Sequence, residues 1–416
     1  MRIDLKYGGG ALPLVLPDDA AVDVYEPKAA APLADPVEKF HAVLDAPLGC
    51  LPLEARNAPN SIAIAVPDET RPFPIKLLLP PLLDRIFAAW PELGGSNVTV
   101  IVGGGLHPPA SPAQIARILP DDLRGCRIVA HDAEHSPMKF FGSTSRGTPV
   151  ELNAAFGEAD LKIVLGMVDT HQFVGFTGGS KGAVIGCASA AAIAANHAML
   201  RNPAAVAGAI DDNPVRLDLN EAGEMAGIQF AVNVVLDAAK RPVAVLAGLP
   251  VLVMREASRL TGELYGLSFS EPYDIVVASC GGKPKDICLY QAQKGLNSAM
   301  QCAKKGGHIL LLAECEQGIG DDVYYDYVSR FSSAGELMKT FEAEPFRMGA
   351  HKAYLFARST TRYDVVIHSA LPADILAKCL LTPGDMQKSV DGWLGGNKKA
   401  RIAVLKNANS SFFTKV

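Results

Sequence analysis

The feature that most constrains this chain is a recurring unit in which a short apolar run ends abruptly in glycine or polar residues. In the first half of the chain the unit occurs four times, at SIAIAVPDETRP, NVTVIVGGGLHPP, CRIVAHDAEHS and LKIVLGMVDTHQF. Stretches of helical composition separate several of these runs, for example over residues 112–119. Strands that alternate with helices are typical of a parallel sheet. The pattern therefore predicts a doubly wound, mostly parallel α/β domain, with polar side chains beyond the carboxyl ends of its strands.

The same unit returns in the last third of the chain and indicates a second α/β domain. YDIVVASCGGKPKD, HILLLAECEQGIG and YDVVIHSA each read as an apolar strand that ends in polar residues, and ARIAVLK supplies a late strand. The length of 416 residues also exceeds one typical core, because a domain takes roughly 100–200 residues. We predict an N-terminal domain over residues 1–268 and a C-terminal domain over residues 269–416, with the active cleft between them.

Two further segments complete the predicted N-terminal domain. MRIDLKYGGGALPLVLP reads as a small hairpin, and the next thirty residues, which are rich in Pro and Ala, read as a surface connection. Residues 230–248 read as a second hairpin that turns at residues 238–241 and closes the sheet of this domain.

Composition and charge argue against several classes of partner. The net charge is −5 and no cluster of Lys and Arg appears, whereas nucleic-acid binding needs a basic surface. The N-terminus lacks the apolar core of a signal peptide, and no apolar run reaches the roughly 20 residues of a membrane span. The eight cysteines show neither a CxxC pair nor zinc-type spacing. We expect a soluble, cytoplasmic protein that binds neither nucleic acid nor membrane.

Residues 166–200 combine reactive side chains with a bare backbone. His171 precedes Lys181 by ten residues and His197 follows it by sixteen, and the lysine lies in the glycine-rich segment TGGSKG. Glycine permits positive φ and close approach to the main chain, and the alanine-rich run before His197 favours a helix. A loop that binds a nucleotide phosphate is a second interpretation, although the spacing matches neither a P-loop nor GxGxxG. A histidine at a helix end is also often only a packed or capping residue.

Four motifs, in this order along most of the chain, resemble the lactate racemase family of nickel-pincer enzymes. They are PDETRP (67–72), GGGLHPP (103–109), the array of His171, Lys181 and His197, and YQAQK (290–294). The resemblance implies an isomerase that racemises or epimerises a 2-hydroxy acid, lactate or a larger one. The implied reaction is reversible hydride transfer to a nickel-pincer nucleotide, a pyridinium mononucleotide that holds nickel through two sulfur groups and a ring carbon. The enzymes that build this cofactor are implied partners.

The resemblance also implies roles for individual residues. Lys181 corresponds to the covalent tether of the cofactor and His197 to the metal ligand, and neutral imidazole suits nickel. His107 and His171 correspond to an acid/base pair on opposite faces of the substrate, a task that suits the near-neutral pKa of histidine. The carboxylate anchors are Arg71 and Lys294. Further candidates for the substrate are Asp68, Tyr290 and Gln291, with Asp68 orienting Arg71 or a histidine. Gly178, Gly179, Lys283 and Lys285 are candidates for the cofactor, and the two lysines, in GGKPKD, are expected to contact its phosphate.

Two alternatives remain open. Doubly wound sheets also favour a nicotinamide-dependent 2-hydroxy acid dehydrogenase, although no GxGxxG follows any strand. A non-catalytic relative could keep the fold without the cofactor. Pro108 stands where the family often has an arginine after the histidine, so the identity of the 2-hydroxy acid stays open.

Overall fold

The structure is a computed structural model that describes all 416 residues. The chain divides into two compact units. We call Ala29–Leu264 the central unit, because it is continuous and lies in the middle of the chain. We call the other the split unit, because it combines Met1–Lys28 with Tyr265–Val416.

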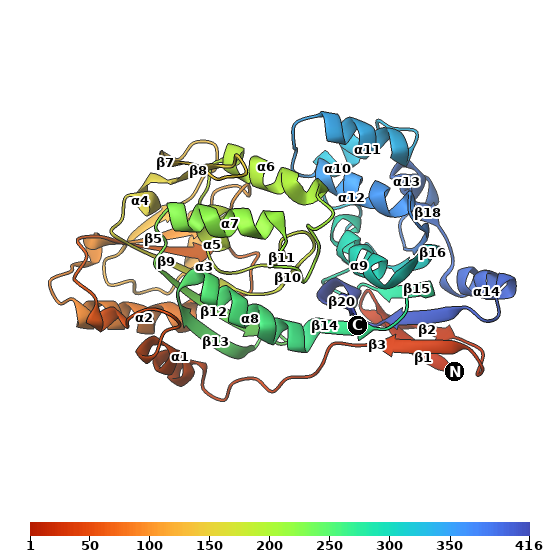
Figure 1. Cartoon of the computed structure of the whole chain (residues 1–416), viewed down its shortest axis with the longest axis horizontal. Helices are drawn as coiled ribbons and strands as arrows, with labels where there is room; N and C mark the ends of the chain where they lie inside the picture. The colour runs from red at the N-terminus through yellow and green to blue at the C-terminus, as the bar shows by residue number, and fades with distance from the viewer. The chain divides into compact units, whose positions relative to one another are not determined.

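A six-stranded sheet in the order β13-β12-β9-β4-β5-β6 forms the core of the central unit (Figure 1). All neighbouring strands are parallel except β12 and β13, which form the predicted antiparallel hairpin. The near-continuous burial of β4, β5 and β9 explains why their sequences are predominantly apolar rather than alternating. The strands are β4 (Ile62–Pro67), β5 (Val98–Gly103), β6 (Arg127–Ala130), β9 (Leu161–Met167), β12 (Phe230–Leu236) and β13 (Pro242–Gly248).

Most helices of the central unit begin directly after a side chain that caps them. Asp35, Ser111, Ser189 and Asn213 each accept hydrogen bonds from backbone N–H groups of the first helical turn. The predicted helix over residues 112–119 is confirmed. The helices are α1 (Pro36–Asp45), α2 (Ile75–Ala89), α3 (Pro112–Ile118), α4 (Ala154–Gly157), α5 (Lys181–Val184), α6 (Ala190–Ala198), α7 (Pro214–Met225) and α8 (Pro250–Tyr265), the last of which ends at the first residue of the split unit.

Short elements connect these helices and strands. Two antiparallel pairs, β7 (Met138–Ser143) with β8 (Pro149–Asn153) and β10 (Thr170–His171) with β11 (Gly175–Phe176), lie outside the main sheet. Single 3-10 turns occur at Leu53–Ala55, Gly95–Asn97 and Met199–Arg201. No helix anywhere in the structure has the length and the apolar character that crossing a membrane would require.

The order of strands in the central sheet determines where a ligand is expected. β5 and β6 lie on one side of β4, whereas β9, β12 and β13 lie on its other side. The connections that leave β4 and β9 therefore run in opposite directions, and in open α/β sheets ligands bind beyond the carboxyl ends of such neighbouring strands. Asp68 and Arg71 follow β4, and His171 and Lys181 follow β9. Four predicted site residues of this unit thus follow β4 and β9, the neighbouring strands from which the chain leaves in opposite directions, and His107 follows the adjacent strand β5.

The split unit has its own six-stranded sheet, in the order β18-β17-β16-β15-β19-β3, and all its neighbouring strands are parallel (Figure 1). The strands are β3 (Ala21–Tyr25), β15 (Tyr273–Ser279), β16 (Ala303–Leu312), β17 (Asp364–His368), β18 (Thr382–Pro383) and β19 (Arg401–Leu405). The helices are α9 (Leu289–Cys302), α10 (Asp322–Val328), α11 (Ala334–Ala343), α12 (Ala350–Thr360), α13 (Ala373–Lys378) and α14 (Met386–Gly396), with a 3-10 turn at Ala408–Ser410. Two small parts complete the unit: the predicted N-terminal hairpin of β1 (Arg2–Tyr7) and β2 (Gly10–Val15), and the parallel pair of β14 (Gly266–Phe269) and β20 (Phe412–Lys415).

The first 28 residues differ from the sequence-based assignment, which placed them in the N-terminal domain. β3 pairs with β19 over five residues, from Ala21 opposite Arg401 to Tyr25 opposite Leu405. The Tyr25 hydroxyl lies 2.6 Å from that of Tyr273, which donates to Asp23 at 2.6 Å. The expected surface connection therefore contains a strand of the split unit, and it also contains α1. The short, largely exposed strand AVDVY gives no local signal of this partner, because the pairing joins distant parts of the chain.

Candidate active site

Two buried side chains hold the glycine-rich segment that precedes Lys181. Arg216 on α7 is fully buried and donates through Nη1 to the carbonyl of Gly178 at 3.3 Å and through Nη2 to the carbonyl of Phe176. Asn233 on β12 accepts a hydrogen bond from the backbone N–H of Gly179 at 2.8 Å. The segment is thus attached both to a helix and to the central sheet, which places Lys181 at the first position of α5.

The packing of the protein itself requires glycine at residues 178 and 179. Gly178 and Gly179 have φ values of 85° and 61°, where other residues are strained. A Cβ atom at residue 178 would lie 2.3 Å from a methyl group of Val168, and one at residue 179 would lie 2.9 Å from Cβ of Met254. These contacts account for both glycines without a ligand. The predicted contact of Gly178 and Gly179 with a cofactor therefore stays a prediction.

Lys181 carries an amine of unusually low basicity. Burial lowers its pKa to about 7, and the positive charges of Arg71 and Arg216 act in the same direction. Desolvation disfavours the charged form of a lysine, so a large fraction of the amine is unprotonated near neutral pH. Only the unprotonated amine is a nucleophile. This lysine is therefore suited to form a covalent bond.

His197 is a buried, neutral imidazole near the end of α6, as predicted from the alanine-rich run. Burial and the nearby charge of Lys181 lower its pKa to about 3. The ring of Phe173 contacts both neighbouring histidines, with centroid distances of 5.2 Å to His197 and 4.6 Å to His171. His171 Nδ1 accepts a hydrogen bond from the backbone N–H of Val174 at 3.3 Å. The structure thus brings His171, Lys181 and His197 into one neighbourhood.

A second predicted histidine, His107, forms a pair with Asp68 from the adjacent strand connection. His107 Nδ1 lies 2.6 Å from Asp68 Oδ2, and the hydroxyl of Thr70 donates to Asp68 Oδ1 at 2.6 Å. Partial burial would raise the pKa of Asp68, but the hydrogen bonds from His107 and Thr70, with the charges of His107 and Arg71, hold it below its usual value. Asp68 is therefore a carboxylate that orients His107, an arrangement suited to general acid/base chemistry.

In the split unit, Tyr290, Gln291 and Lys294 lie on the N-terminal half of α9. Lys352 on α12 is buried, donates to Gln293 Oε1 at 3.1 Å and lies 5.3 Å from the centre of the Tyr290 ring. Burial, followed by the charge of Lys294, lowers the pKa of Lys352 well below its ordinary value. Lys352 is thus a buried amine close to the predicted carboxylate anchor Lys294, and it lies outside the motifs discussed above.

The two lysines predicted to contact a cofactor phosphate have other interactions. Lys283 forms an ion pair with Glu316 and lies 3.8 Å from Glu314, and the hydrogen bond with Glu316 is the main reason that its pKa is raised. The carbonyl of Lys285 accepts a hydrogen bond from Asn409 Nδ2 at 2.9 Å. The nearby carboxylates make Lys283 less available to a phosphate, and both phosphate contacts stay predictions.

Sequence reasoning missed the polar residues that support this site. Arg216, Asn233 and Asp218 are buried and lie outside every motif discussed above, whereas Asn196 is buried within residues 166–200 but was not singled out there. Arg216 and Asp218 lie on an otherwise ordinary helix, so their only sequence signal is the presence of two charges on the face that α7 buries.

The chain is similar to lactate racemases throughout most of its length. The family model for the lactate racemase N-terminal domain matches residues 7–208, and the model for the C-terminal domain matches residues 269–391. The lactate racemase of Thermoanaerobacterium thermosaccharolyticum is 30% identical over 344 residues, which cover 81% of this chain and 80% of that protein. The lactate racemase of Lactiplantibacillus plantarum is 32% identical over 344 residues, which cover 80% of each.

Solved structures show the same fold. The lactate racemase apoprotein from Thermoanaerobacterium thermosaccharolyticum superposes with a TM-score of 0.90 and 26% identity, covering 100% of both chains. A protein from Thermotoga maritima superposes with a TM-score of 0.66 and 17% identity, covering 94% of this chain and 100% of that one. The second likeness concerns the fold alone.

Proposed function

We propose, since the chain belongs to the lactate racemase family of isomerases, that it interconverts the two enantiomers of a 2-hydroxy acid, lactate or a larger one. The observation that carries the proposal is the pairing of Lys181, whose pKa is about 7, with the neutral imidazole of His197. A nucleophilic amine beside an imidazole that can bind a metal is what a covalently tethered nickel cofactor needs.

The residues of the central unit fit a nickel-pincer nucleotide. Lys181 would hold it covalently and His197 would provide a ligand to nickel. The cofactor would itself bring most of the donors to nickel, so a single imidazole of the protein would be enough. The structure contains no group of three or more His, Cys, Asp and Glu side chains that could hold a metal ion without the cofactor. Arg216 is fully buried and its Nε atom has no hydrogen-bond partner, so the site has positive charge available to an anionic nucleotide.

The chain's own residues would bind the substrate and move its hydroxyl proton. When bound, the cofactor supplies an acceptor for the hydride of substrate C2, which it returns to either face. His107, held through Nδ1 by Asp68, would take the hydroxyl proton with Nε2. His171 would serve the opposite face. Because its Nδ1 accepts from Val174, a neutral His171 carries its proton on Nε2 and can donate it. Two histidines allow the reaction to run in both directions.

Arg71 and Lys294 would anchor the substrate carboxylate. Arg71 offers a planar pair of donors that matches a carboxylate, which a lysine cannot reproduce. Arg71→Lys is therefore expected to raise KM by about tenfold despite the retained charge, a loss of roughly 1.4 kcal/mol. Tyr290 and Gln291, on the same helix as Lys294, are the further predicted substrate contacts.

Two measurements test the proposed function. Protein co-produced with the cofactor-building enzymes should show a covalent adduct by intact mass spectrometry, and this adduct should disappear in a Lys181 variant. A substrate deuterated at C2 should keep most of its deuterium in the racemised product, because the hydride returns to the same carbon. Rapid exchange of this deuterium with water would refute hydride transfer. Loosely held nicotinamide nucleotide instead of an adduct would favour the dehydrogenase alternative, and no ligand under any condition would favour a non-catalytic relative.

A further inference from the structure

We propose that Asn196 and Asp218 are positioning residues that hold His197 in the tautomer with its proton on Nδ1, so that Nε2 is the nitrogen that carries the lone pair with which an imidazole binds a metal. This inference rests on the proposed role of His197 as the nickel ligand. It concerns the protein before the cofactor binds, and the hydrogen bonds that carry it involve α6, α7 and the turn between β7 and β8.

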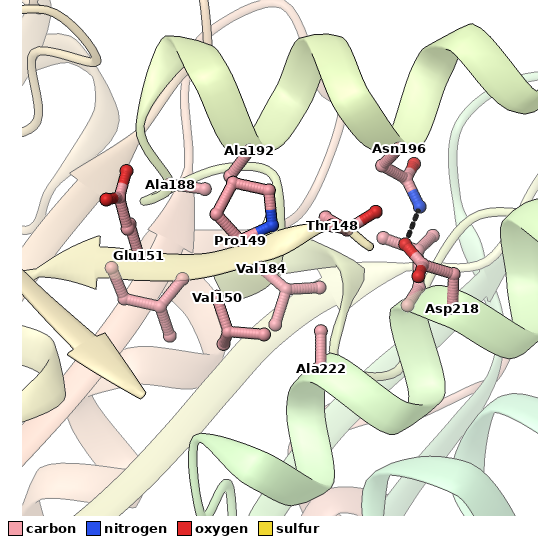
Figure 2. A pocket seen from close by; sticks show the side chains of 12 residues that line it. Thr148, Pro149, Val150, Glu151, Val184, Ala188, Ala192, Asn196, Asp218 and Ala222 are labelled. Carbon is pink, nitrogen blue, oxygen red and sulfur yellow. Dashed lines mark hydrogen bonds between the residues drawn. The ribbon is translucent and has the colours of Figure 1, made fainter. Parts of the chain in front are cut away.

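The orientation of the Asn196 amide follows from its acceptors. Its nitrogen Nδ2 lies 2.8 Å from Asp218 Oδ2 and 3.3 Å from the carbonyl oxygen of Val215. Both partners can only accept, so the amide nitrogen must face them and the amide oxygen must face away. Figure 2 shows Asn196 on α6 with its nitrogen directed at Asp218. That amide oxygen lies 3.1 Å from His197 Nδ1. Since the oxygen can only accept, the imidazole must donate, and its proton is on Nδ1.

Asp218, which determines the orientation of Asn196, is itself held in place by hydrogen bonds. It is fully buried, and its second oxygen accepts a hydrogen bond from the hydroxyl of Thr144 at 2.5 Å. Thr144 is held in turn by the backbone N–H of Thr148, which donates to its hydroxyl at 3.1 Å. A buried polar group without partners is costly, so this sequence of hydrogen bonds resists rearrangement.

A second buried pair in the same unit gives the opposite tautomer by the same reasoning. Asn153 Oδ1 accepts from the backbone N–H of Ala155 at 3.1 Å, so its amide nitrogen faces His131 Nδ1 at 3.2 Å. His131 Nε2 lies 3.0 Å from the carbonyl oxygen of Ala188 and must donate to it. The proton of His131 is therefore on Nε2. The two histidines form a matched comparison within one protein.

The expected consequence is a preorganised metal ligand. A histidine that binds a metal through one nitrogen commonly donates its other N–H to an oxygen, and loss of such a partner typically weakens metal binding about 10–100-fold. Here the oxygen belongs to an amide whose orientation a buried carboxylate determines. In His131, by contrast, Nε2 carries the proton and therefore has no lone pair with which to bind a metal.

Tautomers of the apoprotein are measured directly by NMR of protein labelled with ¹⁵N-histidine and made without the cofactor-building enzymes. In the wild type we expect His197 to be protonated at Nδ1 and His131 at Nε2. In Asn196→Ala the Nδ1–H form of His197 should fall from nearly all molecules to a minority, and His131 should not change. Asn153→Ala, which removes the corresponding amide of the second pair, is the matched control and should leave His197 protonated at Nδ1.

The pocket in Figure 2 makes Asn196→Ala a workable variant. Asn196, Asp218, Thr148 and Ala192 line this pocket, so the truncation enlarges an existing space instead of opening a new one in the apolar core. If the variant nevertheless fails to fold, the wild-type spectrum still tests the proposal, because it reports the tautomer of His197 directly. Protonation of wild-type His197 at Nε2, or an unchanged tautomer in a folded Asn196→Ala variant, would overturn the proposal.

A second readout separates this proposal from the proposed function. In protein with the cofactor attached, Asn196→Ala should keep the adduct mass on Lys181 and lose nickel to a chelator about 10–100-fold faster than the wild type. Equal rates of nickel loss would refute the positioning role. If the wild type never acquires an adduct or nickel, the proposed function fails. The tautomer measurement on the apoprotein would still test whether Asn196 and Asp218 position His197.

Discussion

At the scale of single residues, the low pKa that makes Lys181 a nucleophile also lowers the stability of the folded protein. In an unfolded chain a lysine has a pKa of about 10.4, whereas in the folded protein burial and the charges of Arg71 and Arg216 lower it to about 7. Between these two values the unfolded state binds more protons, so the free energy of unfolding rises with pH across this window. The cost of holding this lysine is therefore largest below pH 7 and disappears above about pH 10.

Replacing Lys181 by Met tests this trade-off. Met keeps the length of the side chain and removes the charge, so we expect a gain of about 1–3 kcal/mol in unfolding free energy at pH 6.5, allowing for partial exposure, and a smaller gain at pH 10. Urea unfolding of the apoprotein at both pH values measures it. Lys39→Met, at an exposed lysine of α1, is the control and should show neither gain. A Lys181→Met protein that is less stable at pH 6.5 would mean that Lys181 makes stabilising contacts.

The pair of Asp68 and His107 leads to a kinetic prediction. Asp68→Asn keeps the shape but removes the carboxylate that orients His107 through Nδ1, so kcat should fall by about 10–100-fold in both directions with a smaller change in KM. Racemisation rates from each enantiomer measure it. Thr70→Val, which removes only the hydroxyl hydrogen bond to Asp68, is the control and should cost much less. A wild-type kcat in Asp68→Asn would exclude a catalytic contribution from this pair.

At the scale of elements, α7 organises two parts of the candidate site at once. Arg216 on this helix holds the carbonyls of Phe176 and Gly178, and Asp218, two residues later, holds Asn196 on α6. α5, α6 and α7 pack together (Figure 1). The glycine-rich segment before Lys181 and the proposed metal ligand His197 are therefore positioned by one helix, whose start is fixed by the cap residue Asn213.

Arg216→Met is expected to destabilise the protein by about 2–4 kcal/mol, because two buried carbonyls lose their charged donor. The fraction of protein that acquires the covalent adduct on Lys181 should also fall, since the loop before Lys181 loses its anchor. Thermal or urea unfolding and intact mass measure the two effects. Arg146→Met is the matched control, because Arg146 is exposed and pairs only with Ser145 and Glu221 on the surface, and it should stay within about 0.5 kcal/mol of the wild type. Equal stabilities of the two variants would contradict the anchoring role.

At the scale of the whole molecule, the split unit depends on both ends of the chain. β3 pairs along β19, and Leu5 and Leu14 of the N-terminal hairpin belong to the same core as Ile275 and Val404. The central unit, by contrast, is continuous and has its own apolar core. Removing the first 28 residues would expose the edge of β19 and part of the core, and exposed strand edges promote aggregation.

We therefore expect residues 29–264 to fold alone, and residues 265–416 to aggregate or remain unfolded. Residues 1–28 joined to residues 265–416 by a flexible glycine-serine linker should restore a soluble, cooperatively folding protein. Circular dichroism and size-exclusion chromatography of the three proteins measure this. A stable, monomeric protein from residues 265–416 alone would show that the N-terminal strands are dispensable for the split unit.

Local sequence determined the parallel sheets and the places of the principal candidates. The buried strands are predominantly apolar runs followed by polar residues, so the positions of Asp68, His107 and His171 beyond strand ends could be predicted. The glycine-rich segment of Lys181 and the helix that ends near His197 could be predicted as well. These features follow from backbone preferences and burial, which act over a few neighbouring residues.

Only the tertiary structure decided which distant residues support those candidates. No residue near β3 in the sequence indicates that β19 is its partner. No motif predicts the contact of Arg216 with Gly178 or of Asp218 with Asn196. Lys283 reads as a phosphate contact in its own segment, yet Glu316 from another segment pairs with it. The physical reason is the same in each case. Hydrogen bonds and ion pairs depend on distance in space, and the fold brings together donors and acceptors that the order of the chain keeps apart.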